Sequence, residues 1–122
     1  MSGAAPRPQL KRLPMSTVEI LVAARALIGV RERWCAFDPA QNEVGWEVAP
    51  RSSAARSWCA LGAVQKVAPA RCLIARLAAA ELLDRQAQAK YGRRLTELND
   101  YCGYPYVLEV YDLAIAAARK LE

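Results

Sequence analysis

Hydrophobic residues recur at helical spacing in four stretches of the chain, which predicts an all-α domain of about four helices. The first helix covers residues 16–28, because Ser16 and Glu19 match a capping box and Gly29 provides a stop. We expect this helix to bury one face, made of Ile20, Ala23, Ala24, Leu27 and Ile28.

Two longer helices are expected in the middle of the chain. The first of these spans 53–67, begins at a Ser52-Ser53 cap and ends before Pro69. The next spans 70–91 and is stopped by Gly92. Its residues spaced for burial are Cys72, Leu73, Leu77, Ala80, Leu83 and Ala87.

The C-terminal part predicts one more long helix after a loop. Residues 93–99 add a turn or two of helix, and residues 100–105 form the loop. Pro105 suits the first position of a final helix over 105–120. The residues expected to be buried there are Val107, Leu108, Tyr111, Ala114, Ile115 and Ala118.

Residues 30–52 depart from the helical pattern. Val44, Trp46 and Val48 alternate with smaller or polar residues, a period of two that predicts a strand at 44–48. We therefore expect a short irregular or β-hairpin insertion between the first two helices. Its large aromatic side chains should lie against the helices, since exposure would forgo the free energy of burial. These side chains are Trp34, Phe37 and Trp46.

The first fifteen residues differ in composition from the rest of the 122-residue chain. They contain three prolines and three basic residues, so residues 1–15 are predicted to be a disordered basic arm before a single helical domain over 16–122. The net charge of +5 comes largely from this arm. No stretch is apolar enough to cross a bilayer and no secretory signal is recognisable, which favours a cytoplasmic protein.

The chain contains no histidine, which limits the chemistry it offers. Histidine is the commonest general base and a frequent zinc ligand, so imidazole-activated nucleophiles and His-ligated zinc are excluded. The four cysteines show no Cys-x-x-Cys spacing and are expected to be free and mostly buried, with Cys102 the better reactive-thiol candidate. We expect no catalytic residues, no metal and no cofactor.

Two short motifs resemble parts of a site. The Trp58–Ala63 block contains a mid-helix glycine, which indicates close helix packing, or else a Trp-floored pocket with Cys59 on its wall. Leu98-Asn99-Asp100 either caps the helix that follows or binds a polar group of a ligand. Asp112 is expected to cap a loop or pair with an arginine.

These motifs occur in one order along the chain. A first helix ending Ala26-Leu27-Ile28, Trp34, the 58–63 block, residues 98–100 and the Val110–Ile115 segment resemble a family of small bacterial and phage proteins known as a domain of unknown function. The resemblance covers about residues 17–118 and implies no established activity, substrate or cofactor. In that family Asn-Asp is commonly followed by a basic residue, whereas Tyr101 follows here.

The sequence favours a small non-enzymatic binding or interaction module whose partner is an unknown protein or small molecule, with homo-oligomerisation left open. A pocket would lie between the second helix and the start of the last one, lined by Trp58, Cys59, Asn99, Asp100 and Tyr111. One alternative is a nucleic-acid-binding regulator with a helix-turn-helix, which would use Arg71, Arg76, Arg93 and Arg94. The other alternative is an enzyme based on a cysteine or a carboxylate.

Overall fold

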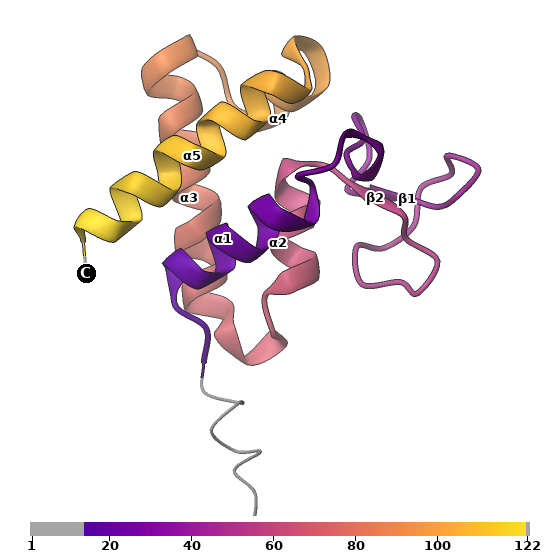
Figure 1. Ribbon diagram of the computed structural model, residues 1–122, viewed down its shortest axis with the longest axis horizontal. Coiled ribbons are helices and arrows are strands. Elements are labelled where there is room, and N and C mark those ends of the chain that lie inside the picture. The colour runs from indigo at the N-terminus through magenta and orange to yellow at the C-terminus, as the bar shows by residue number, and fades with distance from the viewer. Residues whose placement is uncertain (1–13, 122) are drawn as a thin grey trace, which may run out of the picture.

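The computed structural model describes residues 14–121 and is mostly helical (Figure 1). It confirms the all-α fold with an insertion between the first two helices. Most of the predicted basic arm lies outside the described residues. The helices are α1 (Thr17–Leu27), α2 (Ala60–Val67), α3 (Leu73–Tyr91), α4 (Leu95–Glu97) and α5 (Tyr104–Lys120).

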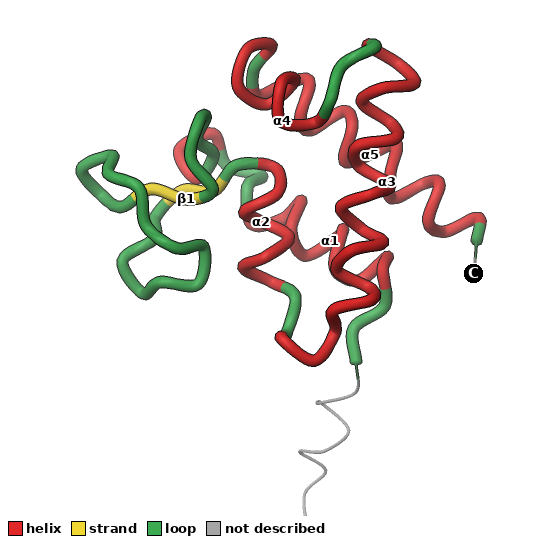
Figure 2. The backbone as a smooth tube through the Cα atoms, turned by 180° about the vertical axis from the view of Figure 1, so that it is seen from behind, coloured by secondary structure: helices red, strands yellow, loops and turns green. Residues whose placement is uncertain are grey.

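Helices α1, α3 and α5 pack against one another and enclose the core. In Figure 1, α3 runs behind α1 and α5, and the view from behind in Figure 2 brings it to the front. The capping box of α1 forms as predicted, since the backbone N–H of Glu19 donates to Ser16 Oγ at 3.1 Å and that of Ser16 to Glu19 Oε1 at 2.8 Å. The large side chains buried almost completely are Ile20, Leu21, Ile28, Val64, Leu83, Leu95, Leu98, Val107, Val110 and Tyr111.

The insertion projects to one side of the helices (Figures 1 and 2). Its antiparallel strands are β1 (Ala40–Gln41) and β2 (Ser57–Trp58), with Ala40 opposite Trp58. No regular strand forms at 44–48, but the predicted return pairing is present in part: an isolated antiparallel bridge joins Gln41 to Glu47, and Asn42 N donates to Trp46 O at 2.9 Å. The Asn42 side chain accepts hydrogen bonds from the N–H groups of Val44 and Trp46, which closes a tight loop before this bridge.

Two of the three aromatic residues in the 30–52 segment do not lie against the helices as expected. Phe37 is 65% exposed and Trp46 is 73% exposed. The third of these residues, Trp34, is half-buried, and the centre of its ring lies 5.7 Å from the centre of the Tyr104 ring. The exposed aromatic side chains therefore carry no share of the core.

The second helix begins seven residues later than predicted. Ser52 Oγ accepts from Ala54 N and so closes a local turn instead of capping a helix. Arg56 N donates to Gln41 O and Cys59 N donates to Pro39 O, which keeps residues 56–59 extended. Helix α2 can begin only after this pairing ends, so Trp58 lies in β2 and not in a helix.

Helix α3 differs from its predicted burial pattern. A 3₁₀ turn over Ala70–Cys72 precedes it, and the face turned to the core is Ala79, Leu83 and Ala87. Leu73 and Leu77, predicted to be buried, are 47% and 55% exposed, and Ile74 is 81% exposed. Because these buried residues are four positions apart, they form one narrow stripe along the helix, and Leu73, Ile74 and Leu77 lie outside it.

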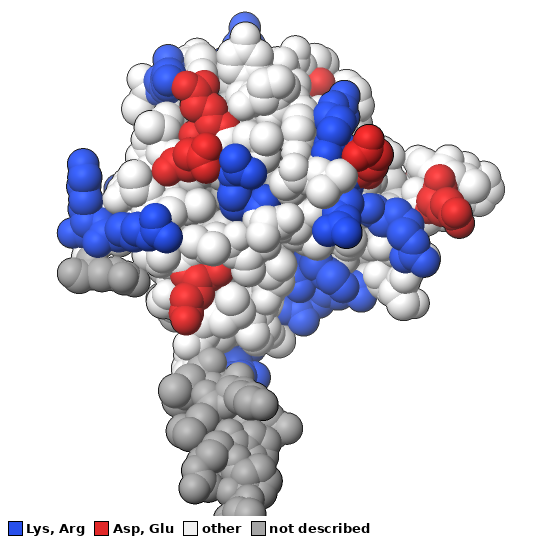
Figure 3. Space-filling view, in the orientation of Figure 1, with Lys and Arg blue, Asp and Glu red and all other residues white. Residues whose placement is uncertain are grey.

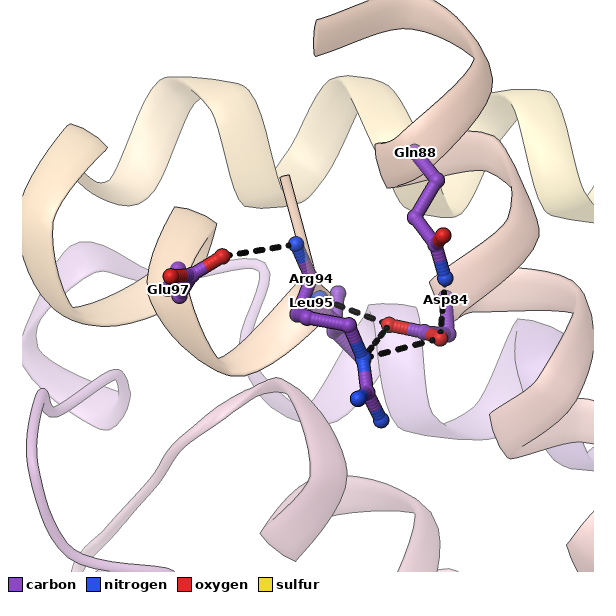
Figure 4. A network of polar contacts seen from close by, with 5 residues as sticks. All are labelled: Asp84, Gln88, Arg94, Leu95 and Glu97. Atoms are coloured by element: carbon purple, nitrogen blue, oxygen red, sulfur yellow. Dashed lines mark hydrogen bonds and ion pairs between the residues drawn. The ribbon is translucent and has the colours of Figure 1, made fainter. Parts of the chain in front are cut away.

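The carboxylate of Asp84 in α3 fixes the start of α4 (Figure 4). Leu95 N donates to it at 2.8 Å, Gln88 Nε2 at 2.7 Å, and Arg94 Nε lies 3.3 Å away. Partial burial raises the pKa of Asp84, but these hydrogen bonds and the Arg94 charge outweigh it and lower the pKa below its ordinary value. Helix α4 leads directly into a π-helical turn (Leu98–Cys102), which carries two of the predicted site residues.

Acidic and basic side chains are interspersed on the face over α1 and α5 (Figure 3). One pair on this side joins Arg25 of α1 to Asp112 of α5 at 3.0 Å, which confirms the expected arginine partner. Within residues 14–121 no helix is both long and apolar enough to cross a membrane.

Candidate ligand cleft at the start of helix α2

The side chain of Asn99 joins three separate segments of the chain. Its Oδ1 accepts from Trp34 Nε1 at 2.8 Å and from Ala60 N at 2.9 Å. Its Nδ2 donates to Cys35 O at 3.2 Å and to Asp100 Oδ1 at 3.0 Å. Asn99 is 2% exposed, so these bonds satisfy a buried amide and hold the 34–35 segment, α2 and the π-helical turn together.

The N-terminus of α2 is capped from two directions. Cys59 is the N-cap residue, and its Sγ accepts from Gly62 N at 3.2 Å. Asn99 satisfies Ala60 N, the first N–H of the helix, from the π-helical turn. The sequence-based placement of Cys59 several residues inside a helix is therefore wrong, because the thiol lies at the helix start.

Behind α2, the fully buried Tyr111 supports the same helix end. Its hydroxyl donates to Ala60 O at 2.7 Å, so α5 is tied to the first residue of α2. Burial raises the pKa of Tyr111 well above its ordinary value, which keeps this hydroxyl a donor. Tyr111 is thus a structural anchor behind the cleft.

Asp100 stabilises an unusual backbone conformation at Phe37. Phe37 has φ 75°, in the left-handed region that side chains other than glycine rarely adopt, and its N–H donates to Asp100 Oδ1 at 2.7 Å. The exposed rings of Phe37 and Tyr101 meet edge to face at 5.6 Å. Neither Asn99 nor Asp100 caps the helix that follows, contrary to the capping interpretation, because the N-cap residue of α5 is Gly103 and no side chain caps this helix within residues 14–121.

A cleft of about 180 Å³ opens between the 37–39 segment, the start of α2 and the α4–π-helical turn. Its walls combine apolar side chains with a few polar groups. The lining residues are Phe37, Asp38, Pro39, Cys59, Ala60, Leu61, Gln65, Leu95, Thr96, Asn99 and Asp100.

Three of the five predicted pocket residues line this cleft, and two do not. Cys59, Asn99 and Asp100 lie on its wall. Trp58 is directed elsewhere, since its Nε1 donates to Pro50 O at 2.9 Å, and Tyr111 is buried behind α2. The floor of the cleft is therefore not a tryptophan.

Sequence reasoning missed the residues that the insertion and α4 contribute. Phe37, Asp38 and Pro39 reach the cleft because Pro39 O accepts from Cys59 N, a pairing between distant segments that leaves no local pattern. Thr96 reaches it because Asp84 fixes the start of α4. The Asp38-Pro39 pair was the one local signal that could have pointed to this segment of the cleft, since such a pair marks a turn and here follows a large aromatic residue.

The two thiols next to Asn99 are poor nucleophiles. Burial raises the pKa of Cys35 to about 11. Burial likewise raises the pKa of Cys59, and the hydrogen bond from Gly62 N only partly opposes this. Both thiols are therefore protonated near neutral pH. All four cysteines are free, and Cys102 is half-buried in the π-helical turn.

The four predicted nucleic-acid contacts fall at opposite ends of α3. Arg71 lies in the 3₁₀ turn before α3 and Arg76 in its first turns, whereas Arg93 and Arg94 follow its end, which is about 22 Å along the helix axis from Arg76. Arg94 is also paired with Asp84. Between residues 14 and 121, moreover, no three His, Cys, Asp or Glu side chains come together as ligands for a metal.

A larger apolar groove of about 650 Å³ lies between the start of α1, the first turns of α3 and the end of α5. Ile74 and Leu121 are exposed along it. Its edge is formed by Pro14, the first described residue. The cleft at the start of α2 is the better candidate site because polar groups from distant segments converge there.

The structure defines a small, mostly helical domain with a polar cleft at the start of α2. Residues 13–117 match DUF6197, a family of unknown function, and the chain belongs to that family. Searches of curated proteins and of solved structures gave no match.

Proposed function

We propose that this protein is a non-enzymatic binding module that takes part of its ligand into the cleft at the start of α2. One observation carries the proposal: Asp100 holds Phe37 in a left-handed conformation, which keeps an exposed aromatic ring at the mouth of a cavity. Backbone strain of this kind costs roughly 1–3 kcal/mol and clusters at functional sites.

Exposed aromatic side chains support a binding role. Phe37 and Tyr101 contact each other but are 65% and 76% exposed. Large aromatic side chains anchor many protein interfaces because they bury much area at little cost in conformational entropy. A ligand that covers this pair would gain that burial.

The protonated thiols support a role without catalysis. Cysteine chemistry requires a thiolate, and burial raises the pKa of both Cys35 and Cys59. The chain has no histidine that could activate either thiol. The enzyme alternative therefore has less support than binding.

The nucleic-acid alternative also has less support. Helix α3 would be the recognition helix, but its exposed first turns present Leu73, Ile74 and Leu77. Reading base edges requires hydrogen-bonding side chains at such positions.

A fragment screen by two-dimensional ¹H–¹⁵N NMR tests the proposal. The indole N–H of Trp34 bonds to Asn99 beside the cleft, whereas that of Trp58 bonds to Pro50. Bound fragments should shift the Trp34 indole signal and the amides of 59–61 and 96–101 and leave the Trp58 indole unchanged. Hits that shift only other regions, or no hits at all, would contradict the proposal.

Alanine variants of the rim provide the matched comparison. Phe37→Ala and Tyr101→Ala should weaken fragment binding at least five-fold. Trp46→Ala removes an equally exposed aromatic side chain that does not line the cleft and should leave affinity unchanged.

A further inference from the structure

We propose that the cleft selects a cationic group on an apolar stem, such as the ammonium or guanidinium end of a lysine or arginine side chain of a partner. This inference rests on the proposed function and adds the class of ligand. Four features of the cleft carry it: the sign of its charges, its unpaired carboxylate oxygens, its aromatic rim and its apolar walls.

The charged side chains that line the cleft are all acidic. Asp38 and Asp100 are its two ionisable carboxylates, and among residues 14–121 no lysine or arginine lines it, although the chain as a whole carries a net charge of +5. Two carboxylates beside a partly apolar cavity favour a positive ligand group, because attraction is stronger where water is partly excluded.

Each carboxylate has one oxygen left for a ligand. Asp100 uses Oδ1 for Phe37 N and Asn99 Nδ2, and Asp38 uses Oδ2 for Gln41 Nε2. Within residues 14–121, no donor reaches Asp100 Oδ2 or Asp38 Oδ1, and no basic side chain forms an ion pair with either group. Two acceptor positions therefore remain for N–H donors of a ligand.

The aromatic rim suits the same kind of ligand. The Phe37 ring lines the cleft, and Tyr101 packs against it. Aromatic faces attract ammonium and guanidinium groups within about 6 Å of the ring centre. The protein shows this contact nearby, where the guanidinium of Arg31 lies 4.9 Å from the centre of the Trp34 ring.

The size and walls of the cleft favour a side chain over a larger molecule. Its volume of about 180 Å³ is below the roughly 300–1,000 Å³ of drug-sized ligand pockets. Pro39, Leu61 and Leu95 offer apolar contact to a methylene stem. A hard divalent cation fits less well, since it requires about six oxygen ligands and the cleft provides two carboxylates.

Four blocked amino acids test the inference in NMR titrations at low salt: the Nα-acetyl N-methylamides of lysine, arginine, norleucine and glutamate. Norleucine matches the lysine stem without the charge. We expect the lysine or arginine compound to bind with a millimolar Kd, at least ten-fold tighter than norleucine, and to shift the Trp34 indole signal. The glutamate compound should not bind.

Asp100→Asn should reduce the affinity for the cationic compound at least five-fold. The amide oxygen of asparagine can still accept from Phe37 N, so the fold should persist, which the NMR spectrum checks directly. Asp38→Asn is a second variant with the same expected loss. Asp112→Asn removes an equal charge from α5, away from the cleft, and should leave affinity unchanged.

The outcomes separate this inference from the proposed function. Norleucine binding as tightly as lysine, or unchanged affinity in both aspartate variants, would overturn the cation inference while the cleft remains a binding site. Absence of binding by all four compounds would overturn it as well. The uncharged members of the fragment screen decide the proposed function independently.

Discussion

The side-chain amide of Asn99 has two donor and two acceptor positions, and the protein occupies all four. Two of its partners belong to the segment around Trp34 and one to α2. A buried network satisfied in this way fixes geometry, and losing one member leaves several polar groups without partners. At the scale of single residues, this amide determines the shape of the cleft.

Asn99→Ala is expected to lower the free energy of unfolding by roughly 2–5 kcal/mol, because Trp34 Nε1, Ala60 N and Cys35 O would each lose a partner in the interior. Urea denaturation measures the change. Asn99→Asp keeps the acceptor oxygens but cannot donate to Cys35 O, so it should also be destabilised. A loss below about 1 kcal/mol in both variants would contradict the structural role.

The buried thiol of Cys35 makes stability depend on alkaline pH. Burial raises its pKa from 9.0 to about 11, so between these values the unfolded chain loses a proton that the folded chain keeps. The contribution to stability is complete below the unfolded pKa and declines as the pH rises towards the folded pKa. Between the unfolded and the folded pKa, the free energy of unfolding is expected to fall by roughly 1.4 kcal/mol per pH unit.

Urea denaturation of the reduced protein at several alkaline pH values measures this slope. Cys35→Ala removes the thiol and should show a shallower decline than the wild type. Equal slopes in the two proteins would show that the thiol ionises as freely in the folded state as in the unfolded one.

At the scale of elements, the sequence predicted the starts of those helices that carry a local start signal, and it missed the start of α2. The capping box of Ser16 and Pro105 at the start of α5 are local, and both helices begin within a residue or so of the prediction. The start of α2 depends on Cys59 N bonding to Pro39 O, twenty positions away. Such pairing leaves no periodic pattern, and cysteine is an uncommon N-cap residue.

The same limit applies to the candidate site. Cys59, Asn99 and Asp100 could be singled out because their motifs stand apart from the helical pattern. Phe37 could not, because its position at the mouth of the cleft results from a positive φ that the distant Asp100 stabilises. Sequence periodicity reports which residues are buried, and the rim of a cleft is not buried.

Gly62 shows how closely the insertion approaches α2. A Cβ atom at this position would lie 1.8 Å from Pro39 O. The glycine therefore makes room for a loop backbone, whereas the sequence had indicated close packing of a neighbouring helix. Gly62→Ala should lower the free energy of unfolding by roughly 1–3 kcal/mol despite the better helix propensity of alanine. Thermal or urea denaturation measures this.

The exposed residue Gln65 on the same helix supplies the control. Gln65→Ala should change the free energy of unfolding by less than about 0.5 kcal/mol. If Gly62→Ala proved as stable as the wild type, the approach of the 37–39 segment to α2 would be looser than the structure has it.

At the scale of the whole molecule, the helices and the insertion differ in how they are held. Helices α1, α3 and α5 share one core, whereas residues 42–57 are attached by two short strands and turns. Val44 and Trp46 are 72% and 73% exposed. Segments with few buried contacts open at lower free energy than the core.

In limited digestion with chymotrypsin, we therefore expect the peptide bond after Trp46 to be the first one cut among those within residues 14–121. Phe37 and Tyr101 are exposed too, but Phe37 is held by Asp100 and Tyr101 lies in the π-helical turn. Mass spectrometry of early fragments identifies the site, and Trp46→Ala should slow the cut. Early cleavage after Tyr101 would indicate instead that the π-helical turn opens first.

The residues behind the cleft are needed for folding, whereas the exposed residues at its entrance are not. Tyr111 and Asn99 at the rear anchor α2, so exchanging them endangers folding itself, whereas the ring of Tyr101 at the front contributes little to the interior. Exchanges at the entrance, such as at Tyr101, can therefore alter the surface around the cleft while the groups that anchor α2 stay in place.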